Sequence, residues 1–276
     1  MHILSRSHAS PIFGPEQVRQ LEPLLQALSP TPLMQSAGLA CARLALAVAP
    51  HARRIWVAAG PGNNGGDGLE AALHLHQWGK EVLVSLMSST GLSPTDAQAA
   101  LQRAQQAGVR IQPDVPKEWL QKMAAEDLCI DALLGIGASR PLSADLKAWV
   151  LAMQQGAAPV LAIDVPTGLN PQSGQWLGGD NGSSGDHLAV RADHTLSLIA
   201  VQAGLHMGYG RDASGQIWLE DLGYRSSQHQ VLPLAWLNAP YTSAPKSHAS
   251  HKGSHGDMAV IGGEGMAAHG MGMTGA

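Results

Sequence analysis

The stretch that decides the fold is RIWVAAGPGNNGGDGLEAALHLHQWG, residues 54–79. It opens with RIWVAA, an apolar run of strand length, and continues into a turn, residues 60–68, that contains five glycines. From Leu69 onward, apolar residues recur at helical spacing. A strand, a glycine-rich turn and a helix in this order predict the start of an α/β fold.

The rest of the chain repeats this alternation. Further strands are expected at 81–87, 127–134, 159–163, 195–201 and 216–221, and helices at 95–107, 116–126 and 143–155. Residues 15–48 predict two helices separated at Pro30 and Pro32, and the polar, glycine-rich residues 170–186 predict an exposed loop. We therefore expect a Rossmann-like three-layer α/β/α fold with a mainly parallel sheet, whose ligand lies at the carboxyl ends of the strands.

Composition excludes several classes of function. The 276 residues include 17 Lys and Arg against 21 Asp and Glu, a net charge of −4, which argues against binding to nucleic acid or to an anionic membrane. No apolar run has the length of a membrane span or of a signal peptide. The two cysteines, Cys41 and Cys129, lie in apolar segments and are expected to be small buried side chains of a cytoplasmic protein.

The glycine-rich turn, GPGNNGGDG, formally matches G-x-G-x-x-G, in which glycines let backbone N–H groups approach a phosphate. An NAD-dependent oxidoreductase also needs a carboxylate after the second strand, and LVSLMSST offers none. A P-loop is excluded because no Lys-Ser or Lys-Thr follows the glycines. A turn used only for packing stays open as the alternative.

Acidic and polar residues mark the ends of two later strands. Asp164, in AIDVPTGL, suits acid–base chemistry because burial at a strand tip would raise its pKa; the alternative is an Asp that caps the next turn. Asp131 lies within an apolar strand, where a charge needs a partner or a cation. Together with Asn64 and Thr167 it offers oxygen ligands of the kind that suit an alkali or alkaline-earth cation.

In combination, the motifs resemble the NAD(P)H-hydrate epimerases. The resemblance rests on GPGNNGGDG, DALLGIGASRPL (131–142) and IDVPTGLNPQSG (163–174), with LMQSAG (33–38) and ADHTLSLIAVQAGL (192–205) as further blocks, and it covers roughly residues 15–225. Two positions depart from the family pattern. Gln35 stands where Glu is usual, and Gln202 stands where Lys is frequent, which puts a phosphate or entry contact in doubt.

The resemblance implies an isomerase that interconverts the R and S epimers of hydrated NADH and NADPH and feeds a dehydratase. It implies that Asp164 contacts the substrate and serves as the catalytic residue, and that a potassium ion is bound by Asn64, Asp131 and Thr167. A homodimer is compatible with it, although the sequence does not determine the oligomeric state. The implied substrate-binding residues are Asn63, Asn64, Gly65, Gly66, Asp67, Gly135, Ile136, Gly137, Ala138, Ser139, Arg140, Pro141 and Asp164.

The implied chemistry fits an exchangeable proton on Asp164. The substrate carbon bears both a hydroxyl and the ring nitrogen, so it can be inverted by protonating the hydroxyl, forming a planar iminium and adding water to the other face. Ring opening stays an alternative route. A non-catalytic nucleotide-binding module and an NAD-dependent oxidoreductase are the rival functions.

The C-terminal residues carry a second resemblance. We expect an epimerase domain at 1–238, a linker at 239–245, and, at 246–276, the beginning of an ATP- or ADP-dependent NAD(P)H-hydrate dehydratase domain, which HKGSHGDMAVIGG (251–263) resembles. These last residues are too few to build the core of such a domain, so no dehydratase activity is expected from this chain.

Overall fold

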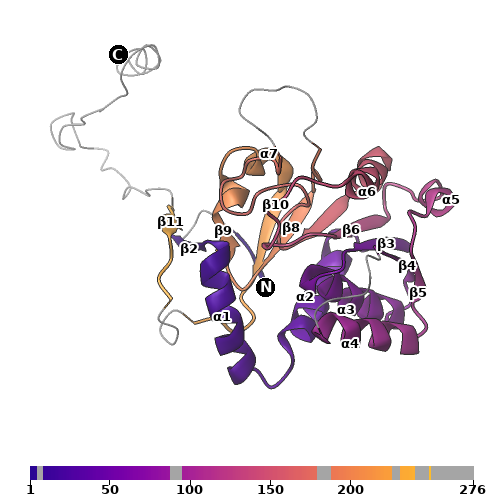
Figure 1. Ribbon diagram of the computed structural model, residues 1–276, viewed down its shortest axis with the longest axis horizontal. Coiled ribbons are helices and arrows are strands. Elements are labelled where there is room, and N and C mark those ends of the chain that lie inside the picture. The colour runs from indigo at the N-terminus through magenta and orange to yellow at the C-terminus, as the bar shows by residue number, and fades with distance from the viewer. Residues whose placement is uncertain (5–8, 88–94, 179–187, 226–230, 240–248, 250–276) are drawn as a thin grey trace, which may run out of the picture. The chain divides into compact units, whose positions relative to one another are not determined.

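The structure is a computed structural model (Figure 1), which describes residues 1–4, 9–87, 95–178, 188–225, 231–239 and 249. The chain divides into two compact units, Met1–Ala239 and Pro240–Ala276. The fold described below is that of the first unit. The expected linker and dehydratase-like residues fall almost entirely outside the described residues, so both stay predictions.

The main sheet has eight strands in the order β1-β10-β8-β7-β6-β3-β4-β5. All neighbouring strands are parallel except β1, which pairs antiparallel with β10 at one edge. The strands are β1 (His2–Ile3), β3 (Arg54–Ala59), β4 (Glu81–Leu86), β5 (Arg110–Gln112), β6 (Leu128–Ala132), β7 (Val160–Ile163), β8 (His194–Leu198) and β10 (Gln216–Glu220).

Helices and a small second sheet complete the unit. The helices are α1 (Pro15–Leu28), α2 (Leu33–Val48), α3 (Asn63–Gln77), α4 (Thr95–Gln106), α5 (Lys117–Leu120), α6 (Ala144–Gln155), α7 (Gly210–Ala213) and the 3-10 helix η1 (Ala203–His206). The second sheet has the order β11-β2-β9, with β2 (Ser10–Phe13), β9 (Val201–Gln202) and β11 (Ala235–Leu237). Sequence periodicity did not predict β1, β2, β5 or β11, because strands of two to four residues are too short to show it.

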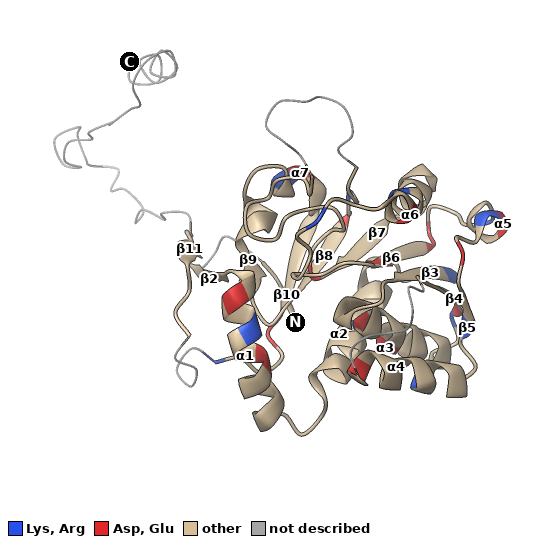
Figure 2. Cartoon of the chain, in the orientation of Figure 1, with Lys and Arg blue, Asp and Glu red and all other residues tan. Residues whose placement is uncertain are grey.

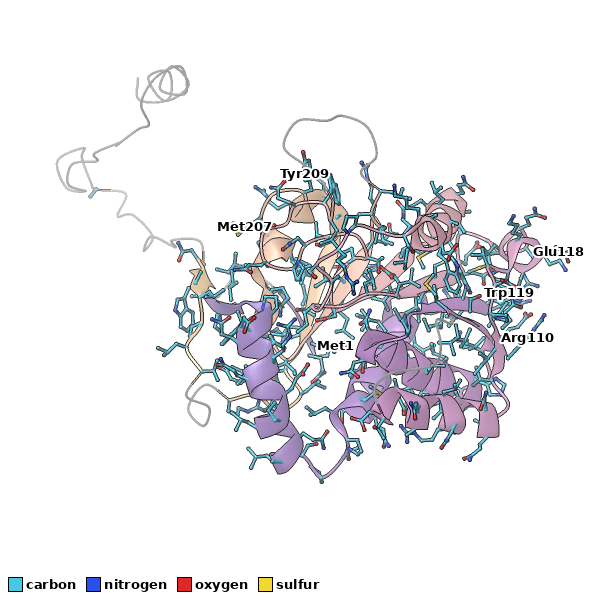
Figure 3. All side chains as sticks on the ribbon, in the orientation of Figure 1. Met1, Arg110, Glu118, Trp119, Met207 and Tyr209 are labelled. Atoms are coloured by element: carbon cyan, nitrogen blue, oxygen red, sulfur yellow. The ribbon has the colours of Figure 1, made fainter. Side chains whose placement is uncertain are left out.

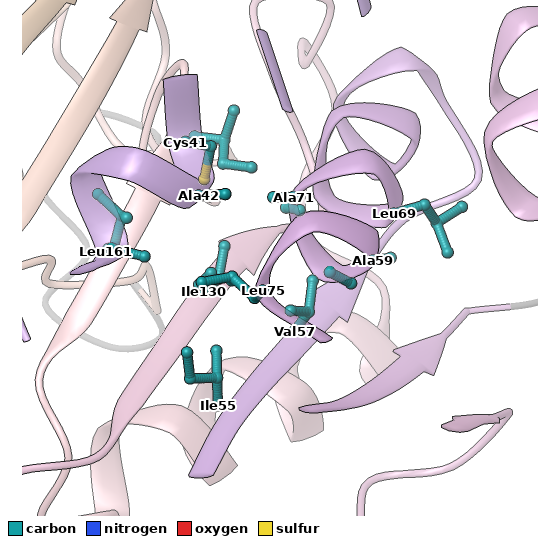
Figure 4. Packing of buried hydrophobic residues seen from close by; sticks show 14 of the residues in the cluster. Cys41, Ala42, Ile55, Val57, Ala59, Leu69, Ala71, Leu75, Ile130 and Leu161 are labelled. Atoms are coloured by element: carbon teal, nitrogen blue, oxygen red, sulfur yellow. The ribbon is translucent and has the colours of Figure 1, made fainter. Parts of the chain in front are cut away.

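The sheet separates two hydrophobic clusters, as expected for a three-layer fold. Ile55, Val57 and Ala59 of β3 pack in one cluster with residues of α2, α3 and α4 (Figure 4). The alternate residues, Trp56 and Ala58, pack in the other cluster with α6. Both faces of a central parallel strand are thus buried, which explains why its sequence is a continuous apolar run. The three-layer prediction is confirmed, and so is the burial of both cysteines.

Three predicted elements differ from the observed ones. The turn expected at 60–68 ends early because α3 begins at Asn63, with Gly62 as its N-cap. The helix expected at 116–126 is only α5, because the Asp127 carboxylate accepts the Ala124 N–H and draws the chain into the turn before β6. The strand expected at 195–201 splits at Ile199, whose φ of 64° cannot continue a strand, so β9 joins the second sheet.

The strand order places a crevice next to β3. The chain runs outward from β3 to β4 and β5, then returns to β6 on the other side of β3. The connections after β3 and β6 therefore leave the sheet in opposite directions, and a crevice opens between them at the carboxyl ends of the strands. This is where the predicted site residues converge.

Candidate active site

A cavity of about 890 Å³ lies at the carboxyl ends of the central strands. Its walls come from the β3–α3 turn, the segment after β6, the ends of β7 and β8, and the helices α1 and α2. Of the residues predicted to bind substrate, the following line it: Asn63, Asn64, Asp67, Gly135, Ile136, Gly137, Ala138, Ser139, Arg140, Pro141 and Asp164.

The β3–α3 turn brings the N-terminus of a helix to this cavity. Pro61, Gly62 and Asn63 line it, and α3 begins at the last of them. The first turn of a 15-residue helix exposes backbone N–H groups and the positive end of the helix dipole, an arrangement that favours an anion such as a phosphate.

Gly65 and Gly66 lie in the same turn of helix but contact protein. A Cβ on Gly65 would overlap the backbone carbonyl of Gly60, and one on Gly66 would lie 2.5 Å from the sulfur of Met34. Neither lines the cavity. These two glycines let α3 pack closely on its neighbours, so packing accounts for their residue type. Their predicted contact with substrate stays a prediction.

Asn64 presents a buried amide to the cavity. Its relative exposure is 8%, and neither its Oδ1 nor its Nδ2 has a hydrogen-bond partner among the described residues. A buried amide without partners costs about 1–3 kcal/mol. A bound group that accepts from or donates to this amide would remove that cost.

Asp164 follows β7 and lines the cavity in an unusual backbone conformation. Its φ is 69°, in the left-handed region, and its backbone N–H donates to the Leu196 carbonyl at 2.7 Å. The Ile136 backbone N–H donates to its Oδ2 at 2.9 Å. Burial, helped by the Glu22 carboxylate, raises the pKa of Asp164 to about 7 against the lowering effect of this hydrogen bond. Near neutral pH this carboxyl can both give and take a proton.

Two more carboxylates face the cavity, Asp67 on α3 and Glu22 on α1. Burial raises the pKa of Asp67 well above its ordinary value, and the charges of Asp164, Glu22 and Glu70 raise it further. Burial also raises the pKa of Glu22, an effect that the Arg19 guanidinium opposes. Like charges in one cavity favour a shared proton at neutral pH.

Asp131 and Thr167 lie behind the cavity wall. Asp131 is fully buried, and it accepts the Thr167 backbone N–H and hydroxyl, each at 2.8 Å. Burial raises the pKa of Asp131 to about 6, against the lowering effect of these hydrogen bonds. The Thr167 Oγ1 in turn accepts the Leu134 N–H at 3.1 Å. Together they tie the end of β7 to the segment after β6, which forms part of the cavity wall.

Comparison with known proteins agrees with this arrangement. The family model described as YjeF-related protein N-terminus matches residues 30–204, more than half of the chain. The chain belongs to this YjeF N-terminal family. The matched residues include the strands from β3 to β8, most of which Figure 1 labels.

Named relatives come from several organisms. The NAD(P)H-hydrate epimerase of Bordetella pertussis (strain Tohama I) is 38% identical over 208 residues, which cover 75% of this chain and 86% of that protein. The bifunctional NAD(P)H-hydrate repair enzymes Nnr of Escherichia coli (strain K12) and Thermofilum pendens are 30% and 31% identical, over 88% and 84% of this chain. The chain spans less than half the length of these two, 45% and 43%.

A solved structure supports the fold. The yeast ynu0 crystal structure has a TM-score of 0.58 at 20% identity, over 82% of this chain and 99% of that one. The resemblance to the NAD(P)H-hydrate epimerases expected from the sequence is confirmed by these relatives and by the family match.

The two departures from the YjeF N-terminal pattern lie away from the cavity walls. Gln35 is half-buried on α2 and does not line the cavity. Gln202 is fully buried and also absent from the cavity walls, and its Nε2 lies 3.5 Å from the Ala200 carbonyl. The doubt that Gln202 raises about a phosphate or entry contact stays a prediction.

The donor set of Asn64, Asp131 and Thr167 fits an alkali cation in its chemistry. All three offer oxygen atoms, and the Asn64 Oδ1 lacks a partner among the described residues. Among the described residues, no three His, Cys, Asp or Glu side chains cluster as ligands, so the chain offers no site of the kind that transition metals prefer there. Asp131 and Thr167 already bond to each other, and a cation would share their remaining lone pairs.

Sequence reasoning missed one wall of the cavity. Helix α1 contributes Val18, Arg19 and Glu22 to it, and Figure 2 shows that this helix carries both acidic and basic positions.

Two apolar residues, Ile199 and Leu222, also line the cavity and share the left-handed backbone of Asp164, with φ of 64° and 46°. Positive φ at a branched apolar residue costs energy and often marks a functional site, but no residue type signals it in the sequence.

Proposed function

We propose that this chain is an NAD(P)H-hydrate epimerase, an isomerase that interconverts the R and S epimers of hydrated NADH and NADPH. The observation that carries the proposal is Asp164, a carboxyl of pKa about 7 in a cavity of about 890 Å³ at the carboxyl ends of a parallel sheet. The names of the relatives support the choice of substrate.

Asp164 performs the proton transfers in this proposal. Its protonated carboxyl donates to the substrate hydroxyl, the C–O bond breaks as the ring nitrogen forms a double bond to carbon, and water leaves. Water then adds to the other face of the planar ring and returns a proton to Asp164. The Ile136 N–H, at 2.9 Å, fixes the carboxylate between these steps. General acid–base catalysis of this kind contributes about 10²–10⁴-fold.

The remaining wall residues bind and orient the nucleotide. The N-terminal N–H groups of α3 and the guanidinium of Arg140 hold the pyrophosphate, and Asn63, Asn64, Asp67 and the segment 135–141 enclose the rest. Asn64, Asp131 and Thr167 would hold a potassium ion, which would supply a positive charge that favours an anionic substrate. The unpartnered buried amide of Asn64 supports this assignment.

A dehydratase specific for the S epimer would consume the product, because epimerisation alone leaves hydrated nucleotide behind. Homodimer formation and a cytoplasmic location stay predictions. No helix in the described residues combines the length and apolar character needed to cross a bilayer.

Coupled turnover tests the proposal directly. An S-specific dehydratase alone leaves the R epimer unconsumed, and addition of this chain should allow complete loss of both epimers. A chain that binds NADPH but leaves the R epimer untouched would instead be a non-catalytic nucleotide-binding module. Hydride transfer to a substrate, monitored by the absorbance of the reduced nicotinamide ring, would support the oxidoreductase alternative.

A further inference from the structure

Glu22 lines the cavity but belongs to none of the sequence motifs at the strand ends. These motifs are the glycine-rich turn and the segments that contain Asp131 and Asp164. Glu22 belongs to α1, and it lines the same cavity as Asp67 of α3 and Asp164 after β7. It interacts electrostatically with both of them. Three carboxylates from three separate elements therefore face one space.

Both acidic and basic groups line the cavity. The cations that line it are Arg19 and Arg140, and the N-terminus of α3 adds the positive end of a helix dipole. A hydrated dinucleotide carries a negative pyrophosphate, which the three carboxylates would repel. The proposed function places the ring end of the substrate beside Asp164, and therefore close to Glu22, which interacts electrostatically with Asp164.

A second observation points to a ligand at the carboxylates. The Asn64 amide, 8% exposed, lines the same cavity and has no partner for either of its polar atoms among the described residues. Gly135 separates it from Asp164, since a Cβ at this glycine would lie 2.9 Å from the Asp164 Oδ2 and 3.4 Å from the Asn64 Cβ. Its Nδ2 is suited to a polar group on the ring of a bound nucleotide, while its Oδ1 is the atom left for the proposed cation.

We propose that Glu22 is a further catalytic residue of this site, whose carboxylate stabilises the positive charge that develops on the substrate ring. The inference rests on the proposed epimerase function. When the protonated hydroxyl leaves as water, the electron pair of the ring nitrogen forms the C=N bond and the ring gains one positive charge. Addition of water to the other face removes that charge and releases one proton. Glu22 keeps its own protonation state throughout.

Glu22 suits this role better than its two neighbours. Asp164 gives and takes the proton, and burial among like charges favours the protonated form of Asp67. Burial raises the pKa of Glu22 as well, but this side chain is only half-buried and the Arg19 guanidinium opposes the rise, so of the three carboxyls Glu22 keeps its charge most readily. It therefore supplies a fixed negative charge where charge develops in the transition state, an effect that acts on turnover more than on substrate binding.

Oxidised and reduced nucleotides provide a direct test. The nicotinamide ring of NAD+ is positively charged, whereas that of NADH is neutral, so the ratio of their affinities reports the field at the ring. Glu22→Gln should lower the preference for NAD+ relative to NADH by about fivefold or more, measured by calorimetry. Glu22→Asp, which keeps the charge, should retain most of the preference.

Turnover and two controls complete the experiment. Glu22→Gln should lower kcat by about 10- to 100-fold and change KM less than about threefold. The exposed Glu16→Gln on the same helix and Glu118→Gln on α5 (Figure 3), neither of which lines the cavity, should leave both readouts unchanged.

The outcomes separate this inference from the proposed function. An unchanged NAD+/NADH ratio in a folded Glu22→Gln variant overturns the role of Glu22, even if the parent chain is an active epimerase. If Glu22→Gln lowers the NAD+/NADH affinity ratio but the parent chain does not epimerise, the negative charge of Glu22 beside the ring is supported and the proposed function is refuted.

Discussion

Replacing Asp164 with asparagine removes the exchangeable proton and keeps the shape of the side chain. Asparagine tolerates the left-handed backbone at this position, and its amide oxygen can still accept the Ile136 N–H. We expect turnover of the R epimer to fall by about 10²–10⁴-fold, since the general acid–base step is lost. NADH affinity should change less than about tenfold, because no binding group is removed.

The same substitution has a calculable effect on stability. Burial raises the pKa of Asp164 from 3.8 to about 7, so the native state binds its proton more tightly than the unfolded state does. The resulting stability is fully present below pH 3.8 and is lost as the pH rises to about 7. The Asn variant lacks this loss, so it should be more stable than the parent by about 4 kcal/mol at pH 8 and by about 2 kcal/mol at pH 5.

Two measurements check this reasoning together. Coupled epimerisation gives the turnover, and thermal or urea unfolding at the two pH values gives the stability difference. A variant that keeps more than half of the parent's turnover would refute the catalytic role of Asp164. If the Asn variant and the parent differ in unfolding free energy by the same amount at pH 5 and pH 8, the raised pKa of Asp164 is refuted.

Three further substitutions test other parts of the site and fold. Gly135→Ala should lower turnover about tenfold or more, because its Cβ would lie 2.9 Å from the Asp164 Oδ2. Gly156→Ala, which does not line the cavity and whose Cβ would meet nothing closer than 3.5 Å, should not, and equal activities of the two variants would contradict this. Asp131→Ala should lower the melting temperature more in potassium buffer than in a buffer of a large organic cation, and equal losses would exclude a bound ion. Asp127→Ala should lower the free energy of unfolding by about 2–4 kcal/mol at pH 7, because three backbone N–H groups lose their acceptor. Its lowered pKa makes this loss smaller as the pH falls below 3.8 toward the lower native value, which urea unfolding at pH 3 and 7 would detect.

The sequence predicted the central layers because their signals are local. Apolar runs such as Val160–Ile163 have the length and composition of buried parallel strands, and Asp164 stands out because a carboxylate directly follows one of them. The start of α3 was misjudged because glycine disfavours a helix, and only the close approach of Gly65 to Gly60 in three dimensions explains its presence there.

Glu22 was missed for a different reason. It lies on an amphipathic helix, where a charged residue is ordinarily a solvated one, and nothing in its neighbourhood along the chain marks it. Its position in the cavity depends on how α1 lies against elements far away in sequence. The split between β8 and β9 was equally invisible, because Ile199 is a residue type that favours strands.

The three left-handed residues of the cavity, Asp164, Ile199 and Leu222, bear on how this protein could be engineered. Glycine at a left-handed position relieves backbone strain, typically of the order of 1 kcal/mol, so a search for thermostable variants would select the half-buried Leu222, whereas loss of the buried Ile199 side chain costs more than the strain it relieves. That gain would remove an apolar side chain from the cavity wall. Heat resistance and turnover would therefore have to be scored in the same screen, since the simplest route to the first runs through a residue that shapes the second.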